Sequence, residues 1–399
     1  MQLAQGMARL GTESAFEVLA RAKALEAQGR DIINLGIGQP DFLTPPHIVE
    51  AAKKALDDGH HGYTPGNGIA PLRQAVAADI RGFRGVEVDP DDIVIVPGGK
   101  LTMFYAILMF GEPGAEILYP NPGFPIYQSM IEYTGAKAVP IPLREDNGFA
   151  FDAAEVIEQI TPATRLLIVN SPANPTGGVV PRPEFDRLAE GLERHPHVAV
   201  LSDEIYARLL YDGTEFVTML AYQSLRDRLI VLDGWSKTYA MTGWRIGYGV
   251  WPRRWAELAT RLNINSVSCT NAPTQYAAIA ALEGPQDAVE TMRQAFDERR
   301  KLIVDATNDV PGMSSITPEG AFYTMANIKG TGLSSKRMES LLLETLGVAT
   351  VAGTSFGSFG EGYIRFSYAN SLDNIREALA RIRDHALAQG WGAELGLAE

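Results

Sequence analysis

Short apolar runs alternate with helical patterns through the middle of the chain, and this alternation limits the fold more than any other feature. Each run holds about four residues, nearly all apolar, as a strand does in a parallel sheet that helices cover on both faces. Strand and helix in alternation predict right-handed crossovers and a doubly wound α/β domain. We predict strands over residues 93–96, 117–119, 166–169, 198–201 and 229–232, with helices over 100–110, 122–134 and 183–195 between them.

The pattern changes near Pro285. Residues 287–309 form one long amphipathic helical pattern, which shorter predicted strands at 321–328 and 363–367 and a helix at 372–389 follow. A chain of 399 residues is also too long for a single core, so two domains are expected. We predict a large domain with a mixed, mostly parallel sheet covered by helices, and a smaller α+β domain built from both chain ends. The expected bounds are residues 49–285 for the large domain, 286–399 for the smaller one, and 1–48 for an N-terminal arm that joins the smaller one.

Composition argues against several classes of function. The formal net charge of −13 and the lack of a basic cluster argue against nucleic-acid binding. No run approaches the roughly 18 apolar residues that a membrane span needs, and residues 1–21 lack the apolar core of a signal peptide. The single cysteine, Cys269, rules out an internal disulfide and suits a reducing compartment, so we expect a cytoplasmic protein. The six histidines show no metal-ligand spacing, so no metal site is expected.

Lys237 follows the predicted strand at 229–232 and stands among apolar and hydroxylated residues. Burying an ammonium costs several kcal/mol, so a lysine in such surroundings is usually paired or reactive. Desolvation lowers the lysine pKa and makes the neutral amine available for a Schiff base with a carbonyl cofactor, of which pyridoxal phosphate is the commonest. The alternative is a lysine at a strand end with its ammonium in water. This segment alone leaves the two interpretations about even.

Two further loops at strand ends suit either a ligand or a plain turn. Gly98 and Gly99 precede the predicted helix at 100–110, where free backbone N–H groups and the helix dipole favour an anion. The spacing does not match a Walker loop, and no G-x-G-x-x-G follows a strand, which argues against a nicotinamide cofactor. In residues 170–178, two X-Pro bonds favour an extended loop that can aim Asn174 at a ligand oxygen.

Asp203 and Arg365 place charges at or within apolar strands. Asp203 follows the predicted strand at 198–201, with Tyr206 three residues further on. A buried acid there needs a partner with a proton to share, which is either a pyridine nitrogen or a side chain of the protein. Arg365 lies between apolar neighbours in the strand at 363–367, and its guanidinium suits a carboxylate in two-point contact. That carboxylate belongs either to a substrate or to the protein itself.

Taken together, in order and spacing over nearly the whole chain, these segments resemble the class I and II aminotransferases. These are pyridoxal-phosphate enzymes of fold type I, and they include aspartate, alanine and aromatic aminotransferases. Seven motifs in sequence favour the Schiff-base lysine over the solvated one at Lys237. The motifs are Asn34-Leu-Gly-Ile-Gly-Gln-Pro-Asp-Phe42, Tyr63-Thr-Pro-Gly-Asn-Gly68, Gly98-Gly-Lys100, Asn174-Pro-Thr-Gly177, Ser202-Asp-Glu-Ile-Tyr206, Ser236-Lys237 with Gly243-Trp-Arg245, and Arg365.

The resemblance implies a role for each of these residues towards the cofactor. Lys237 forms the Schiff base and, once substrate displaces it, moves the proton between the substrate Cα and the cofactor. Asp203 pairs with the pyridine nitrogen. Tyr206 and Asn174 hydrogen-bond the 3-oxygen of the ring, and Phe124 stacks on the ring. The phosphate is held by Ser236, Arg245, the backbone amides of Gly99 and Lys100, and Tyr63 of the neighbouring subunit, which implies a homodimer with shared sites.

By the same resemblance, Arg365 binds the substrate α-carboxylate, with help from Asn174 and the backbone near Gly38. Lys100 has two open interpretations: it contacts the distal carboxylate of a dicarboxylic substrate, or it faces the phosphate or solvent.

The implied reaction is ping-pong transfer of an amino group from an L-amino acid to a 2-oxo acid, either 2-oxoglutarate or pyruvate. A pyridoxal-phosphate lyase that eliminates a β- or γ-substituent is the alternative on the same fold. A regulator built on an aminotransferase-like domain is less favoured, because such proteins carry an added DNA-binding segment and this sequence shows neither that segment nor a basic surface for it.

Overall fold

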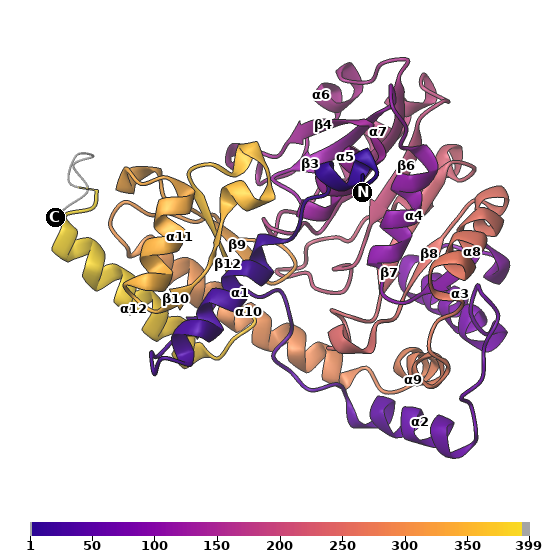
Figure 1. Cartoon of the computed structure of the whole chain (residues 1–399), viewed down its shortest axis with the longest axis horizontal. Helices are drawn as coiled ribbons and strands as arrows, with labels where there is room; N and C mark the ends of the chain where they lie inside the picture. Colours follow the sequence, from indigo (N-terminus) through magenta and orange to yellow (C-terminus); the bar gives the residue numbers. More distant parts are fainter. Residues whose placement is uncertain (1, 393–399) are drawn as a thin grey trace.

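A computed structural model of the protein describes residues 2–392. A large sheet with its helices occupies the right of Figure 1, and a smaller unit occupies the left, with the long helix α10 between them. The helices are α1 (Ser14–Glu26), α2 (Pro46–Asp57), α3 (Ala70–Arg84), α4 (Lys100–Phe110), α5 (Pro125–Thr134), α6 (Ala153–Glu158), α7 (Arg182–Glu193), α8 (Arg253–Val267), α9 (Ala272–Glu283), α10 (Asp287–Asn308), α11 (Ser335–Glu344) and α12 (Leu372–Gln389). The strands are β1 (Ile33–Asn34), β2 (Ile93–Val96), β3 (Glu116–Asn121), β4 (Lys137–Pro142), β5 (Thr164–Asn170), β6 (Ala199–Asp203), β7 (Leu229–Gly234), β8 (Gly247–Val250), β9 (Tyr323–Asn327), β10 (Val348–Ala349), β11 (Val351–Ala352) and β12 (Tyr363–Ser367).

The large sheet has the strand order β2-β8-β7-β6-β5-β3-β4. β8 is antiparallel to β2 and to β7, and the other neighbours in this sheet run parallel. The predicted α/β fold with a mixed, mostly parallel sheet is therefore confirmed. The sequence pattern missed β4 and β8, because Pro140 and Pro142 interrupt the first and Gly247 and Gly249 the second. Both prolines lie on an edge strand, where a missing N–H donor is tolerated.

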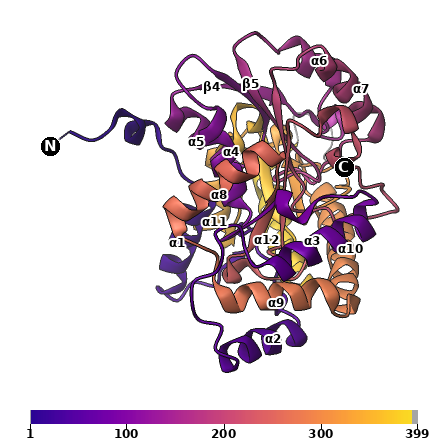
Figure 2. The ribbon, with the colours of Figure 1, turned by 90° about the vertical axis from the view of Figure 1, so that its right-hand side faces the viewer.

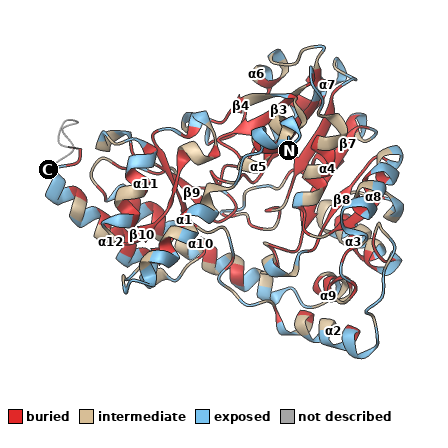
Figure 3. Cartoon of the chain, viewed as in Figure 1, coloured by how far each residue is buried: buried red, intermediate tan, exposed pale blue. Residues whose placement is uncertain are grey.

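Alternate residues of the central strands pack against opposite layers of helices. In β2, Ile93 and Ile95 belong to one apolar core, whereas Val94 and Val96 belong to the other. Helices α3 and α9 contribute to the first core, and α4 and α5 to the second. Figure 3 shows the central strands of the sheet buried beneath these layers. Because both faces are covered, the strands are apolar throughout rather than alternating, which is why the sequence pattern revealed them.

The smaller unit contains the antiparallel sheet β11-β12-β9 and the parallel pair β1-β10. In that pair Ile33 lies opposite Val348, so the N-terminal segment joins the C-terminal part of the chain. Helix α10 buries one face, on which Met292, Phe296 and Ile303 recur at helical spacing. Figure 2 shows the segment before α1 projecting beyond the body of the molecule, next to α5.

Most predicted bounds hold to within a few residues. α4, α12 and β12 begin and end as predicted, but α5 begins at Pro125 rather than at residue 122. The reason is local: a residue before proline is disfavoured in the helical region, and Phe124 is extended, with φ −58° and ψ 123°.

Among the described residues, no helix is both long enough and apolar enough to cross a membrane.

Candidate active site

A pocket of about 500 Å³ lies at the carboxyl ends of β5, β6 and β7, where open α/β sheets bind ligands. Residues of the smaller unit, from β9, β11 and β12, close it from the other side. One predicted site residue is absent from the pocket: Tyr63 is 92% exposed on the surface of the single chain. The predicted residues that line the pocket are Gly38, Gly99, Lys100, Phe124, Asn174, Asp203, Tyr206, Ser236, Lys237, Arg245 and Arg365.

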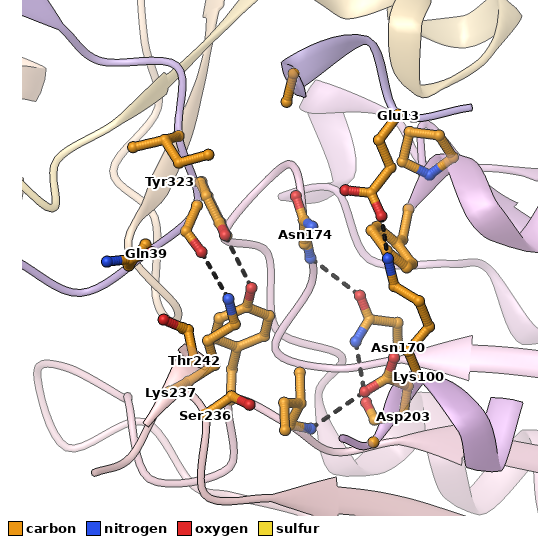
Figure 4. Close-up of a pocket in the computed structure, with 18 of the residues that line it drawn as sticks. Glu13, Gln39, Lys100, Asn170, Asn174, Asp203, Ser236, Lys237, Thr242 and Tyr323 are labelled. Carbon is orange, nitrogen blue, oxygen red and sulfur yellow. Dashed lines mark hydrogen bonds and ion pairs between the residues drawn. The ribbon is translucent and has the colours of Figure 1, made fainter. Parts of the chain in front are cut away.

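Lys237 lies just beyond β7, and its ammonium donates a 2.6 Å hydrogen bond to the carbonyl oxygen of Gly38 (Figure 4). Removal of water from around the ammonium, together with the positive charge of Arg365, lowers the pKa of Lys237 from 10.5 to about 8. A substantial fraction of the amine is therefore neutral near physiological pH. That is the form in which a lysine acts as a nucleophile or a base.

Asp203 ends β6 and is buried. Its carboxylate accepts a 2.6 Å hydrogen bond from the Tyr127 hydroxyl and a 3.2 Å bond from the backbone N–H of Ile205. Burial raises the pKa of Asp203 to about 6, although both hydrogen bonds oppose the rise. The carboxylate has no salt-bridge partner among the described residues. It is therefore a buried acid without a cationic partner in the described part of the chain, and it can pair with the ring nitrogen of a ligand.

Asn170 ties the loop that carries Asn174 to the end of β6. Its side-chain amide donates to the backbone oxygens of Asp203, at 3.0 Å, and Pro172, at 3.2 Å. Its side-chain oxygen accepts a 3.0 Å bond from the backbone N–H of Asn174. This loop is thus held by side-chain hydrogen bonds, which fix where Asn174 enters the pocket.

Arg365 reaches the pocket from β12 between two aromatic rings. Its guanidinium carbon lies 4.6 Å from the ring centroid of Tyr323 and 4.7 Å from that of Phe356. One terminal nitrogen donates a 3.1 Å bond to the Asn174 side-chain oxygen, and the other donates to the backbone oxygen of Gly36. Its Nε is buried without a partner, and no carboxylate within residues 2–392 forms a salt bridge with it. The guanidinium therefore keeps spare donors for the carboxylate of a ligand.

The turn before α4 is shaped to receive an anion. Gly98 has a φ of +88°, and a Cβ at that position would lie 2.1 Å from Nη2 of Arg245. Only glycine therefore lets the Arg245 guanidinium approach this turn. The first N–H groups of α4 have no intrahelical acceptor, and the helix dipole adds to their attraction for negative charge. Ser236, which is buried, supplies a hydroxyl to the same pocket.

Tyr127, Tyr323 and Glu13 are among the polar residues of this pocket that the sequence did not predict. Tyr323 was within reach of a register argument, because Arg365 pairs with Met325 and residues two apart on a strand share a face. Its hydroxyl shares a 2.9 Å hydrogen bond with that of Tyr206. No local pattern pointed to Tyr127 or Glu13, since their partners lie 76 and 87 residues away.

The model of the family "Aminotransferase class I and II" matches residues 30–382. The chain belongs to this family. It is 38% identical over 368 residues to an aspartate aminotransferase of Pyrococcus horikoshii, covering 92% of each chain. It is 39% identical over 360 residues to an aromatic-amino-acid aminotransferase of Thermococcus litoralis, covering 89% of this chain and 92% of that one. The crystal structure of the aspartate aminotransferase from Rhizobium meliloti superposes with a TM-score of 0.92 at 34% identity, covering 96% of this chain and 98% of that one.

The protein is thus a class I and II aminotransferase, and pyridoxal phosphate is its cofactor, as the motifs predicted. The residues of the pocket fit that molecule chemically. A lysine with a lowered pKa suits its aldehyde, and a buried acid suits its ring nitrogen. The turn at Gly98, with Arg245 and the first N–H groups of α4, suits its phosphate.

Proposed function

We propose that Lys237, Asp203 and Arg365 carry the transamination. Their convergence on one pocket, from strands far apart in the chain, is the observation that supports this. When bound, pyridoxal phosphate supplies a ring that withdraws electrons from the substrate Cα. The Asp203 carboxylate favours the protonated ring nitrogen and so strengthens that withdrawal. The neutral amine of Lys237 takes and returns the proton at Cα, and Arg365 holds the α-carboxylate with its spare donors.

The other pocket residues hold the cofactor in this proposal. Tyr206 offers its hydroxyl to the 3-oxygen, and it is free to donate there when the Tyr323 hydroxyl donates to it. The remaining contacts are those of Asn174 with the 3-oxygen, Phe124 with the ring face, and Ser236, Arg245 and the backbone N–H groups of Gly99 and Lys100 with the phosphate.

The reaction is proposed to run in two halves. An L-amino acid would give up its amino group in the first half, and a 2-oxo acid, 2-oxoglutarate or pyruvate, would receive it in the second. The same Arg365 fork serves both halves, because the donor and the acceptor share an α-carboxylate. The names of the relatives offer two kinds of donor, aspartate and aromatic amino acids, and the side-chain end of the pocket has to discriminate between them.

We further propose a homodimer with shared sites, in which a second copy of the chain brings Tyr63 to the cofactor phosphate. The exposure of Tyr63 in the single chain supports this. The large domain is proposed to span residues 49–285 and the smaller one 286–399, with residues 1–48 joining the latter through the pairing of β1 with β10. The free Cys269 suits a reducing, cytoplasmic setting.

The proposal is tested by borohydride reduction of the purified holoenzyme, followed by peptide mapping. We expect the reduced chromophore on the peptide that contains Lys237. A panel of L-amino acids then reports which donors bleach the cofactor absorbance, and 2-oxoglutarate or pyruvate should restore it. A chromophore on another lysine, or bleaching that no 2-oxo acid reverses, would overturn the assignment.

A further inference from the structure

Lys100 is the cation of the pocket to which the proposed function assigns no charge-binding role. The other cations that line the pocket each have one: Lys237 for the aldehyde, Arg245 for the phosphate and Arg365 for the α-carboxylate. Lys100 contributes a backbone N–H to the phosphate, but its ammonium lies elsewhere. That ammonium forms an ion pair with the Glu13 carboxylate, and the two side chains point toward one another in Figure 4.

Glu13 is held at this position by anchors on both sides. Before it, Arg9 and Gly11 hydrogen-bond to α5, at 2.7 Å to the backbone oxygen of Glu132 and 2.9 Å to the hydroxyl of Ser129. After it, α1 packs Val18 and Ala22 against Leu343 and Ala349 of the smaller unit. The Glu13 side chain is only 15% exposed. Its carboxylate is therefore a fixed part of the pocket wall and not a mobile surface charge.

Among the described residues that line the pocket, the pairing leaves no free cation for a second substrate carboxylate. The Lys100 ammonium already contacts Glu13 and lies 5.1 Å from the ring centroid of Phe124. A distal substrate carboxylate that approached the Lys100 ammonium would also come close to the Glu13 carboxylate. The repulsion between these two negative charges would disfavour binding. Apolar side chains also line the pocket, among them Phe16, Ile37 and Phe356.

We propose that Glu13 is a specificity-determining residue, which occupies Lys100 and so selects amino acids with uncharged side chains over aspartate and glutamate. This inference rests on the proposed function of the pocket. By the same argument, the acceptor that suits the pocket is a monocarboxylic 2-oxo acid such as pyruvate. An uncharged side chain lies against the apolar wall without separating the Glu13–Lys100 pair.

The test compares kcat/KM for L-alanine and L-phenylalanine with kcat/KM for L-aspartate in four forms of the holoenzyme. Wild type should favour the uncharged donors. Glu13→Gln keeps the shape of the side chain but frees the charge of Lys100, and should raise the aspartate-to-alanine ratio about tenfold or more. Glu13 makes no capping hydrogen bond to α1, so the substitution removes no helix cap. The double variant Glu13→Gln with Lys100→Gln should lose the gain, because the cation that the dicarboxylate uses is gone.

The matched control is Glu17→Gln, which removes the same charge one turn further along α1 from an exposed side chain outside the pocket. It should leave the ratio at the wild-type value. A readout independent of turnover is the dissociation constant of maleate, a dicarboxylic acid, measured from the cofactor absorbance. We expect it to fall in Glu13→Gln and not in Glu17→Gln.

The inference is overturned if wild type prefers aspartate, or if Glu13→Gln changes the ratio no more than Glu17→Gln does. Either result leaves the aminotransferase intact, because alanine or aspartate still bleaches the cofactor. Failure of every amino acid to bleach it would instead overturn the proposed function.

Discussion

The Tyr127 hydroxyl donates a 2.6 Å hydrogen bond to Oδ2 of Asp203, and both side chains are buried. Tyr127 comes from α5 and Asp203 from the end of β6, so the bond joins the large sheet to one of the helices that cover it. The hydrogen bond favours the ionised carboxylate, whereas burial disfavours it. Burial has the larger effect, so the pKa of Asp203 rises to about 6. The protein thus holds a buried acid at a cost in stability, and in the proposed function the ring nitrogen of the cofactor is its partner.

Asp203→Asn should stabilise the cofactor-free protein and abolish transamination. The folded pKa of Asp203, about 6, lies above its usual 3.8, so its contribution to stability is present below pH 3.8 and is lost as the pH rises through 6. That difference in pKa corresponds to about 3 kcal/mol at neutral pH. Urea denaturation at pH 5 and pH 7.5 should show the advantage of the variant growing with pH. An equal gain in stability at both pH values would contradict the raised pKa of Asp203.

Tyr127→Phe should lower kcat by about tenfold while the fold is retained, since a buried bond to a charged group contributes ~1.5–3 kcal/mol. Loss of the donor removes one influence that lowers the pKa of Asp203, so the acid limb of the kcat profile should move to higher pH. Tyr133→Phe, on the same helix, is the control, because its hydroxyl has no hydrogen-bond partner within residues 2–392. A matching shift in both variants would exclude a role for the Tyr127–Asp203 bond.

Lys237→Ala should reduce turnover by at least about 10³-fold, because the variant loses both its nucleophile and its base. Borohydride should no longer fix the cofactor to the protein, while reversible binding through the phosphate contacts remains measurable by dialysis. Lys53→Ala, a change at an exposed lysine of α2, provides the control and should behave as wild type. Turnover within a few-fold of wild type in Lys237→Ala would refute the mechanism.

The reactivity of Lys237 should titrate near pH 8 in the cofactor-free protein, well below an ordinary lysine. A lowered pKa means that the neutral, reactive amine is present at lower pH. Arg365→Gln removes a cation that contributes to the lowering, so the midpoint should rise above 8. Competitive labelling with an amine-specific reagent across pH 6–11, read by mass spectrometry, measures both midpoints. A midpoint that stays unchanged in Arg365→Gln would show that Arg365 does not contribute to the lowered pKa of Lys237.

Arg84→Ala should destabilise the protein by about 3–5 kcal/mol, because it removes the cation that pairs with two buried carboxylates. Arg84 donates to Glu204 at 3.0 Å and to Asp233 at 2.5 Å, and its side chain is almost fully buried. Arg81→Ala on the same helix breaks an exposed ion pair at 3.8 Å and should cost at most about 1 kcal/mol. Chemical denaturation of both variants gives the comparison. Equal losses would mean that the buried network adds nothing to stability.

Much of the fold was predictable because its signals are local. The strands β2 and β12 and the helices α4 and α12 have their predicted bounds, since apolar runs and helical spacing are properties of a few consecutive residues. β8 was missed because glycines carry no apolar side chain to signal a strand, and Gly247 is required where β8 packs against the turn at Gly99. That requirement comes from a contact between distant segments, which no local pattern contains.

The sequence by itself determined the chemistry of this protein: the motifs around Lys237, Asp203 and Arg365 identified the cofactor and the family. Only the tertiary structure decided how those groups are tuned. The hydrogen bond from Tyr127 to Asp203 spans 76 residues, and the ion pair between Glu13 and Lys100 spans 87. Motifs can be recognised in the sequence because each consists of a few neighbouring residues. The pKa values and the charge pairing depend on burial and on distances between side chains, which exist only once the chain has folded.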